Sequence, residues 1–516
     1  MAVLDDLEVR LTNIAKDQAT CEDPEQLPDT GEVFINGRWQ PAGDTPSDIP
    51  GDTRFPVYSY WNNEDGSDGI FPEDHEGRRQ IAWEKHASKE QGVQAVQAAK
   101  EAWEDWALTS WEERAECLKN FAAIMRADRD RLARLLMLEI AKTEADAYAE
   151  VDRTADYIDE TIRIMLEQPD KEQILYKRLK TLYEKRAIRG KGVVVGIGPR
   201  NYPLNELIAA LVSALAVGNT VVAKGTDQGN LALIALTKKT GHCFPPGVFN
   251  LLYGNREALM GIQEQVANDV AAVVGFVSTE AGFKINAGFN TDEAATQVEL
   301  GMTAKNRVVI MPDADLDKAV EIVIKGSLSY NGQRCTAIKD LLIHEDVVEK
   351  FTQRLVDRID RMKMGSPTDK KNNITPLLNL EAAQKQERLV DNALEKGAKI
   401  ANSSSSTGKA RGAYFFPTIL SGVTDEMEIA HVEQYGPTIP IKSFRIWEEV
   451  VEVHRESPYG QQAVIVTRDP ENWQVQRLRQ ELPLQVQQVW INLPPGRGPD
   501  DKEFGGAKAA YAIGNS

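Results

Sequence analysis

Two patterns of apolar residues alternate along the middle of the chain. Short continuous runs of Val, Ile and Leu are each followed by a segment in which apolar residues recur at helical spacing. Continuous apolar strands that alternate with amphipathic helices predict an α/β fold, with parallel sheets covered by helices on both faces. The runs are "GVVVGIG" (192–198), "TVVAK" (220–224), "VAAVVGF" (270–276), "RVVIM" (307–311) and "DLLIH" (340–344).

The chain before these runs has a different pattern. "GEVFINGRWQPAG" places Asn36-Gly37 between two apolar runs, which predicts a β-hairpin. Residues 44–80 are rich in Gly, Pro, Asp and Asn and predict a long surface loop. From Ser88 to about residue 166, apolar residues recur at helical spacing in three successive segments, which predicts a helical layer.

Composition and charge narrow the class of protein. The 516 residues exceed what one core usually supports, so two or three structural units are expected, with two sheets that divide near residue 300. A net charge of −18 argues against a nucleic-acid partner and against an anionic membrane surface. The N-terminus has no basic region followed by an apolar run, and no stretch of about 18 apolar residues occurs, so we expect a cytoplasmic protein.

The four cysteines, Cys21, Cys117, Cys243 and Cys335, are scattered without CxxC or Cys/His spacing. We therefore expect reduced thiols and no metal site. A lone cysteine in such a chain is commonly a small buried hydrophobic residue, and this interpretation stays open for each of the four.

Candidate chemistry gathers after the predicted strands. Doubly wound sheets bind ligands at the carboxyl ends of their strands. The chain delivers polar residues there in this order: Asn201, Lys224 with Asp227, the turn "GFVSTEAG", Glu299 and Cys335. "VVVGIGPRN" has two glycines in register and lacks the third, so by itself it is a weak dinucleotide fingerprint.

The order and spacing of seven motifs resemble the aldehyde dehydrogenase superfamily, from roughly residue 33 to the C-terminus. "SLSYNGQRCTAIK", "NYPLNE" and "WINLPPGRGPD" further resemble its non-phosphorylating glyceraldehyde-3-phosphate dehydrogenases. The seven motifs are "PRNYP", "VVAKGTDQ", "VELG", "NGQRC", "EQYGP", "ESPYG" and "EFGGAK".

The resemblance implies a division into two doubly wound domains with a small bridging or oligomerisation element. It implies a C-terminal segment that returns to the active site, and it leaves a homodimer or homotetramer possible, although the chain ends without the family's usual final strand. The first 30 or so residues are acidic and turn-rich, and we expect them to form an N-terminal extension. The expected boundaries are 1–30 for the extension, 31–166 with 186–300 for the dinucleotide-binding domain, 167–185 for a bridging hairpin, 301–490 for the catalytic domain and 491–516 for the C-terminal segment.

The resemblance assigns three catalytic residues. Cys335 matches the nucleophile that forms a hemithioacetal and then a thioester. Asn201 matches the oxyanion donor, although an Asn in this place also serves to satisfy a turn. Glu299 matches the base that activates water for hydrolysis, and the alternative is a solvated surface carboxylate.

Cofactor residues follow from the same resemblance. Lys224 and Asp227 match positions at the adenosine ribose, Ser278 the pyrophosphate ligand and Glu433 the nicotinamide ribose. A carboxylate at Asp227 disfavours a 2′-phosphate and favours NAD, whereas the glyceraldehyde-3-phosphate enzymes commonly use NADP. NAD or NADP is therefore expected, and the two indications conflict.

Cationic and hydroxyl side chains near Cys335 predict a small phosphorylated or otherwise anionic aldehyde as substrate. By resemblance these are Arg334, Arg497, Tyr202 and Arg153, and any one of these arginines alone is as well explained as a surface charge. The favoured reaction is oxidation of glyceraldehyde 3-phosphate to 3-phosphoglycerate without inorganic phosphate.

Several residues depart from the family pattern on the cofactor side. Val277 and Met302 stand where glycines are usual, and about two extra residues precede Lys305. Two other functions therefore stay open: oxidation of another small aldehyde or semialdehyde, and a weakened aldehyde-dehydrogenase-like protein that only binds ligands.

Overall fold

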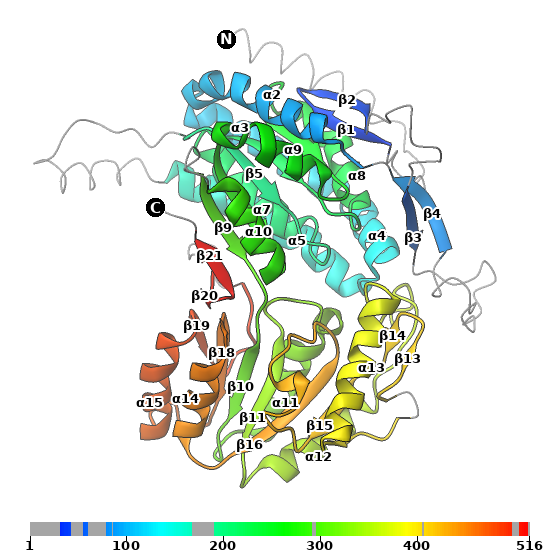
Figure 1. Ribbon diagram of the computed structural model, residues 1–516, viewed down its shortest axis with the longest axis vertical. Helices are drawn as coiled ribbons and strands as arrows, with labels where there is room; N and C mark the ends of the chain where they lie inside the picture. Colours follow the sequence, from blue (N-terminus) through cyan, green and yellow to red (C-terminus); the bar gives the residue numbers. More distant parts are fainter. Residues whose placement is uncertain are drawn as a thin grey trace, which may run out of the picture.

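The apolar runs become the strands of two separate sheets, one in each lobe of the molecule (Figure 1). The computed structural model describes residues 31–42, 55–59, 79–84, 86–167, 190–290, 296–404, 407–497 and 505–513. The predicted N-terminal extension lies outside these ranges, as does the predicted bridging hairpin except for Glu167. The predicted domain boundaries stay predictions.

The first sheet has eight strands, and its central strands are parallel. From β5 the chain passes to β6 and β7 on one side and then to β8 and β9 on the other, so the strand order reverses at β5 and β8. In spatial order the strands are β2 (Arg38–Pro41), β1 (Glu32–Ile35), β7 (Phe249–Leu252), β6 (Thr220–Lys224), β5 (Val193–Ile197), β8 (Val270–Phe276), β9 (Gln297–Gly301) and β21 (Tyr511–Ile513).

Helices pack against this sheet in two groups. One group contains α7 and α8 with α3, α4 and α5, and the other contains α2, α9 and α10. Their bounds are α2 (Lys89–Leu108), α3 (Trp111–Ala127), α4 (Arg129–Ile140), α5 (Glu144–Leu166), α7 (Asn205–Ala216), α8 (Leu231–Thr240), α9 (Glu257–Gln265) and α10 (Thr279–Phe289).

The second sheet has seven strands, of which the central ones are parallel. Apolar side chains of α11 and α12 pack into one core cluster, and those of α14 and α15 into another. In spatial order the strands are β12 (Lys399–Ile400), β15 (Thr418–Ser421), β16 (Thr438–Phe444), β11 (Ile338–His344), β10 (Asn306–Ile310), β18 (Gln462–Val466) and β19 (Gln488–Ile491). The helices are α11 (Leu316–Leu328), α12 (Val348–Ile359), α13 (Leu380–Glu395), α14 (Trp447–Glu456) and α15 (Trp473–Glu481).

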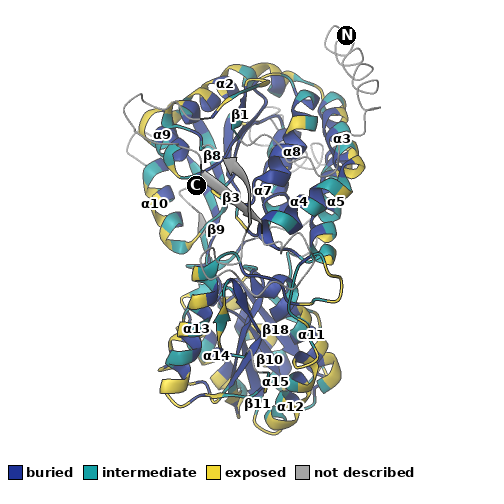
Figure 2. Ribbon diagram, turned by 90° about the vertical axis from the view of Figure 1, so that its right-hand side faces the viewer, coloured by how far each residue is buried: buried dark blue, intermediate teal, exposed yellow. Residues whose placement is uncertain are grey.

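Three two-stranded ribbons complete the described strands: β3 (Phe55–Ser59) with β4 (Arg79–Glu84), β13 (Ala410–Arg411) with β14 (Tyr414–Phe415), and β17 (Tyr459–Gly460) with β20 (Ala507–Lys508). Central strands of both sheets are buried throughout, whereas the outer faces of the helices are exposed (Figure 2). No helix within the described ranges is long and apolar enough to cross a membrane.

The structure confirms the hairpin and the five strands that the apolar pattern predicts. Asn36 and Gly37 have φ values of 51° and 72°, as a tight turn between β1 and β2 requires. Two predictions need correction. The helical layer contains four helices because Asp128 separates α3 from α4, and β3 forms within the predicted loop by pairing with β4.

The C-terminal residues pair with the first sheet. Residues 511–513 form β21, which pairs antiparallel with β9 of the same chain. Tyr511 lies opposite Gly301 in this pairing. The last described strand therefore completes the first sheet of its own subunit.

Candidate active site

A cavity of about 1030 Å³ lies where the two lobes meet, at the carboxyl ends of β5 and β8. This is the point at which the strand order of the first sheet reverses, where open α/β sheets bind ligands. Of the eleven site residues that the sequence predicts, eight line the cavity: Arg153, Asn201, Tyr202, Ser278, Arg334, Cys335, Glu433 and Arg497.

Cys335 is positioned by an unusual turn between α11 and β11. The 3₁₀ segment Ser329–Gly332 contains three left-handed residues in succession, Tyr330 (φ 48°), Asn331 (φ 53°) and Gly332 (φ 73°). Non-glycine residues in this region carry strain of order 1–3 kcal/mol each, so neighbouring groups must hold them. The Tyr330 hydroxyl donates to the Ile140 carbonyl at 2.6 Å, and Asn331 exchanges hydrogen bonds with Thr375.

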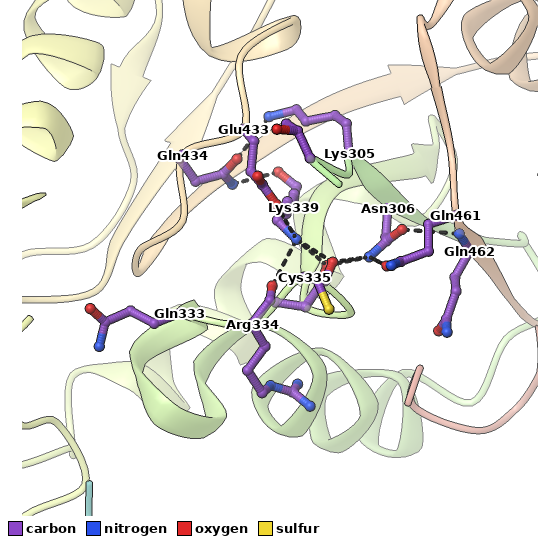
Figure 3. A network of polar contacts seen from close by, with 12 residues as sticks. Lys305, Asn306, Gln333, Arg334, Cys335, Lys339, Glu433, Gln434, Gln461 and Gln462 are labelled. Atoms are coloured by element: carbon purple, nitrogen blue, oxygen red, sulfur yellow. Dashed lines mark hydrogen bonds and ion pairs between the residues drawn. The ribbon is translucent and has the colours of Figure 1, made fainter. Parts of the chain in front are cut away.

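A buried lysine holds the backbone of the Cys335 turn. Lys339 Nζ donates to the carbonyl oxygens of Arg334 at 2.9 Å and Cys335 at 2.7 Å. Asn306 Nδ2 also donates to the Cys335 carbonyl, at 2.8 Å. Figure 3 shows the Cys335 carbonyl facing these donors while the sulfur is turned away from them. These hydrogen bonds therefore fix the backbone of the turn, and the thiol of Cys335 faces the cavity that it lines.

Burial disfavours the thiolate form of Cys335. Burial, and next the negative charge of Glu206, raise the pKa of Cys335 to about 11, although the nearby Lys339 ammonium acts in the opposite direction. Cys117 and Cys243 are fully inside the first core, and burial raises the pKa of each to about 12. Of the three described cysteines, Cys335 alone lines the cavity.

Helix α5 supports the turn that carries Asn201 through hydrogen bonds to the residues after it. Asn201 Nδ2 donates to the Gln333 carbonyl at 2.8 Å, which links the first lobe to the Cys335 turn. The buried Glu150 carboxylate accepts the backbone N–H groups of Leu204 and Asn205 at the start of α7, and it pairs with buried Lys142. Since an amide nitrogen has two N–H groups, Asn201 retains a second donor for an oxyanion.

Glu299 is not among the described residues that line the cavity. Glu299 lies on β9 two residues before Gly301, and residues i and i+2 of a strand share a face. Gly301 lines the cavity, whereas Glu299 lies further from it along the strand. A Cβ on Gly301 would lie 2.7 Å from the Phe276 ring, so this ring packs against the end of β9. The Glu299 carboxylate accepts a hydrogen bond from the Gln297 side chain.

Two predicted cofactor residues also lie off the cavity. Lys224 is buried at the end of β6 and donates to the carbonyl oxygens of Gly225 and Gly254. Asp227 forms a bidentate ion pair with Arg200, with both contacts at 2.7 Å. The charge of Asp227 is thus already matched by a guanidinium.

Ser278 and Glu433 do line the cavity. Ser278 is the N-cap of α10, where its side chain accepts from the Ala281 N–H. Glu433 forms a buried ion pair with Lys339, at 3.1 Å.

The residues of the first lobe fit a dinucleotide. The reversal of strand order opens a crevice beside α10, whose N-terminal backbone N–H groups suit a pyrophosphate. The departures Val277 and Met302 both pack toward Gly282 of α10, because a Cβ on Gly282 would lie 2.4 Å from the Met302 sulfur and 3.4 Å from Val277. Their bulk is therefore accommodated by a glycine on the neighbouring helix.

The predicted substrate residues surround the Cys335 side of the cavity. Arg334 Nη2 donates to the Lys325 and Gly326 carbonyls, and its buried Nε has no hydrogen-bond partner among the described residues. Tyr202 lies under Lys142, whose Nζ is 3.3 Å from the ring centroid. Arg497 is engaged by a carboxylate that the sequence interpretation missed, since Arg497 Nη1 donates to Glu206 Oε2 at 2.6 Å.

Sequence reasoning missed Glu206 and Lys339. Glu206 carries the one charge in the apolar helix "NELIAALVSALA", and an ionised group in such a helix signals a buried pair. Lys339 stands beside Asp340 in the otherwise apolar core of a buried strand, "IKDLLI", which is a similar signal.

Comparison with known proteins places this geometry in a family. The sequence pattern of the aldehyde dehydrogenase family matches residues 62–514. A curated NADP-dependent glyceraldehyde-3-phosphate dehydrogenase from Streptococcus equinus is 32% identical over 435 residues, which are 82% of this chain and 87% of that protein. The 3,6-anhydro-alpha-L-galactose dehydrogenase of Vibrio sp. (strain EJY3) is 30% identical over 416 residues, which are 79% of this chain and 84% of that protein.

The fold has matching relatives among solved structures. One is the NADP-dependent glyceraldehyde-3-phosphate dehydrogenase from Bacillus halodurans C-125 in complex with NADP, with a TM-score of 0.78 and 26% identity. The match covers 94% of this chain and 95% of the other. The α/β fold with two doubly wound sheets, as the sequence predicts, is therefore that of known enzymes.

Proposed function

Because this chain belongs to the aldehyde dehydrogenase family, we propose that it oxidises a small polar aldehyde to its carboxylic acid, with NAD or NADP as cofactor and Cys335 as nucleophile. The observation that carries the proposal is the meeting of Cys335 and Asn201 in one cavity beside the dinucleotide crevice. No inorganic phosphate takes part, because water releases the acid from the enzyme.

The residues of the cavity account for the covalent steps. The Cys335 thiol gives its proton to water, and the thiolate attacks the aldehyde carbon. The resulting oxyanion accepts hydrogen bonds from the Asn201 amide and a backbone N–H. A nicotinamide dinucleotide, when bound, supplies the hydride acceptor. The oxidised acyl group is then a thioester on Cys335, and hydrolysis of its C–S bond restores the thiol.

The cofactor residues support either dinucleotide. Ser278 and the N-terminus of α10 would hold the pyrophosphate, and Glu433 lies on the nicotinamide side by its resemblance. Asp227 disfavours a 2′-phosphate only while its charge is unmatched, and Arg200 matches it. We therefore propose both NAD and NADP as cofactors, to be ranked by assay.

Glyceraldehyde 3-phosphate is the first substrate to test. Arg153 and Arg334 line the cavity, and the relative from Streptococcus equinus carries this substrate in its name. The ion pair of Arg497 with Glu206 favours a second candidate, an unphosphorylated small aldehyde. Both candidates use the same chemistry at Cys335.

The test is the formation of reduced cofactor from each aldehyde, without phosphate or arsenate, by the wild type and by Cys335→Ser. We expect reduction of NAD or NADP by the wild type and none by the variant, since an alcohol in place of the thiol is a far weaker nucleophile. If neither cofactor is reduced with any small aldehyde, the chain binds ligands without oxidising them and the proposal fails.

A further inference from the structure

A buried carboxylate stands inside the aldehyde cavity, on the first turn of α7. Glu206 lines the cavity together with Cys335, and its side chain is 13% exposed. The sequence of α7 offers it no other charged residue. A buried carboxylate is stable when paired, and here its partner is Arg497 from the segment that follows β19.

The pair changes what Arg497 can bind. Its side chain is 19% exposed, and Nη1 is occupied by Glu206 at 2.6 Å. A guanidinium grips phosphate best through two parallel N–H groups, so a phosphate must displace Glu206 or bind beside its negative charge. Among the predicted phosphate ligands, Arg497 is therefore the one whose binding of phosphate Glu206 opposes.

Glu206 lies close enough to Cys335 for its charge to act on the thiol. Its carboxylate acts on the thiol of Cys335, and burial raises its own pKa even though Arg497 and Lys142 oppose this change. Glu150 adds a further negative charge on the α5 side. A phosphate placed beside Arg497 meets the Glu206 carboxylate in the cavity lining, whereas a hydroxyl group can donate a hydrogen bond to Glu206.

We propose that Glu206 is a specificity-determining residue: by engaging Arg497 and presenting a hydroxyl acceptor beside Cys335, it selects an uncharged hydroxyaldehyde over a phosphorylated one. This inference rests on the proposed oxidation of aldehydes at Cys335. It names the substrate class of that site as small aldehydes that carry hydroxyl groups and no phosphate.

The test compares kcat/KM for glyceraldehyde and glyceraldehyde 3-phosphate in the wild type, in Glu206→Gln and in a matched control. The control is Glu264→Gln, which breaks an exposed ion pair with Lys89 on the surface of the first lobe. The wild type and the control should both prefer glyceraldehyde by about tenfold or more, the scale of one hydrogen bond to a charged group.

Glu206→Gln should raise kcat/KM for the phosphorylated substrate by about tenfold, mainly through KM, because it frees Arg497. The value for glyceraldehyde should stay equal or fall. A purely structural role would lower both values together. The inference is overturned if Glu206→Gln leaves the ratio unchanged or if the wild type prefers the phosphorylated substrate.

A measurement on the wild type alone covers the case in which the variant does not fold. Inorganic phosphate, set against potassium chloride of equal ionic strength, should not compete with glyceraldehyde. Competition at low millimolar phosphate would contradict the inference. If the wild type oxidises neither aldehyde, the proposed function itself fails; if it oxidises them without the predicted selectivity, only the role of Glu206 fails.

Discussion

At the scale of single residues, the chemistry depends on how one thiol is held. The carbonyl side of Cys335 is tied to Lys339 and Asn306, and the sulfur is turned away from these donors (Figure 3). Burial and the charge of Glu206 both disfavour its thiolate. A thiol with a raised pKa is mostly protonated near neutral pH, so its reactivity should increase as pH rises.

The pH dependence of alkylation tests this state. Because the pKa of Cys335 is raised to about 11, its thiolate fraction increases as pH rises and stays small below that value. Alkylation of Cys335 by iodoacetamide, followed by mass spectrometry without cofactor, should accelerate by about tenfold for each pH unit between pH 7 and 9. Lys339→Met should slow it further and Glu206→Gln should speed it. A rate that is independent of pH in this range would contradict the raised pKa.

A second residue-scale prediction concerns the base for hydrolysis. The motif predicts Glu299 as this base, but Glu299 is not among the described residues that line the cavity, and its carboxylate accepts a hydrogen bond from Gln297. Glu299→Gln preserves the shape of the side chain and should leave steady-state turnover close to that of the wild type. A loss of about a hundredfold, the contribution of a general base, would show that Glu299 reaches the thioester after all.

At the scale of elements, the active site is assembled by turns whose strain is offset by their neighbours. The left-handed turn before Cys335 is held by Asn331, whose Nδ2 donates to the Thr375 carbonyl at 2.9 Å and to its hydroxyl at 3.0 Å. Thr375 N–H donates back to Asn331 Oδ1 at 3.2 Å. These bonds are buried, so their loss leaves unsatisfied polar groups.

Asn331→Ala should therefore lower the free energy of unfolding by about 3 kcal/mol, from lost hydrogen bonds and from a positive φ that alanine tolerates poorly. Asn331→Gly should lose about 1 kcal/mol less, because glycine adopts a positive φ without strain. Urea unfolding of the three proteins provides the measurement. Equal losses for the two variants would show that the turn is not strained.

The elements also show what the sequence can predict. Asn36-Gly37 and the apolar runs predict the hairpin and the central strands, because the turn residues and the periodicity of apolar residues are local signals. The pairing of β3 with β4 was missed because the Gly, Pro, Asp and Asn residues between them predict a loop, although Phe55, Val57 and Tyr58 are residues typical of strands. Whether Glu299 reaches the cavity depends on how β9 packs in the tertiary fold, which a motif match does not show.

At the scale of the whole molecule, the site exists only because two lobes meet. Asn201, Glu206 and Ser278 belong to the first lobe, whereas Cys335, Glu433 and Arg497 come from the second part of the chain. Sequence motifs predicted eight of the cavity residues one by one, but the Glu206–Arg497 pair joins positions that only the tertiary fold brings together. A ligand in the cavity contacts both lobes and should stabilise the whole fold.

Thermal unfolding measures that linkage. A ligand of the native state at about a hundred times its Kd stabilises by about 2.7 kcal/mol, so NAD or NADP should raise the Tm of the wild type. Cys335→Ser should show the same increase, since the dinucleotide crevice lies beside α10. If neither cofactor changes the Tm at millimolar concentration, Val277 and Met302 block the crevice and the cofactor assignment is wrong.

The most direct test of the central claim is to trap the acyl group on the enzyme. The protein is mixed with NAD or NADP and excess aldehyde, quenched with acid within the first turnover, digested and analysed by mass spectrometry. We predict that the peptide containing Cys335 gains the mass of the acyl group, and that hydroxylamine removes it, as expected of a thioester. Reduced cofactor formed without any modification of Cys335 would contradict the account, because oxidation would then proceed without the covalent intermediate.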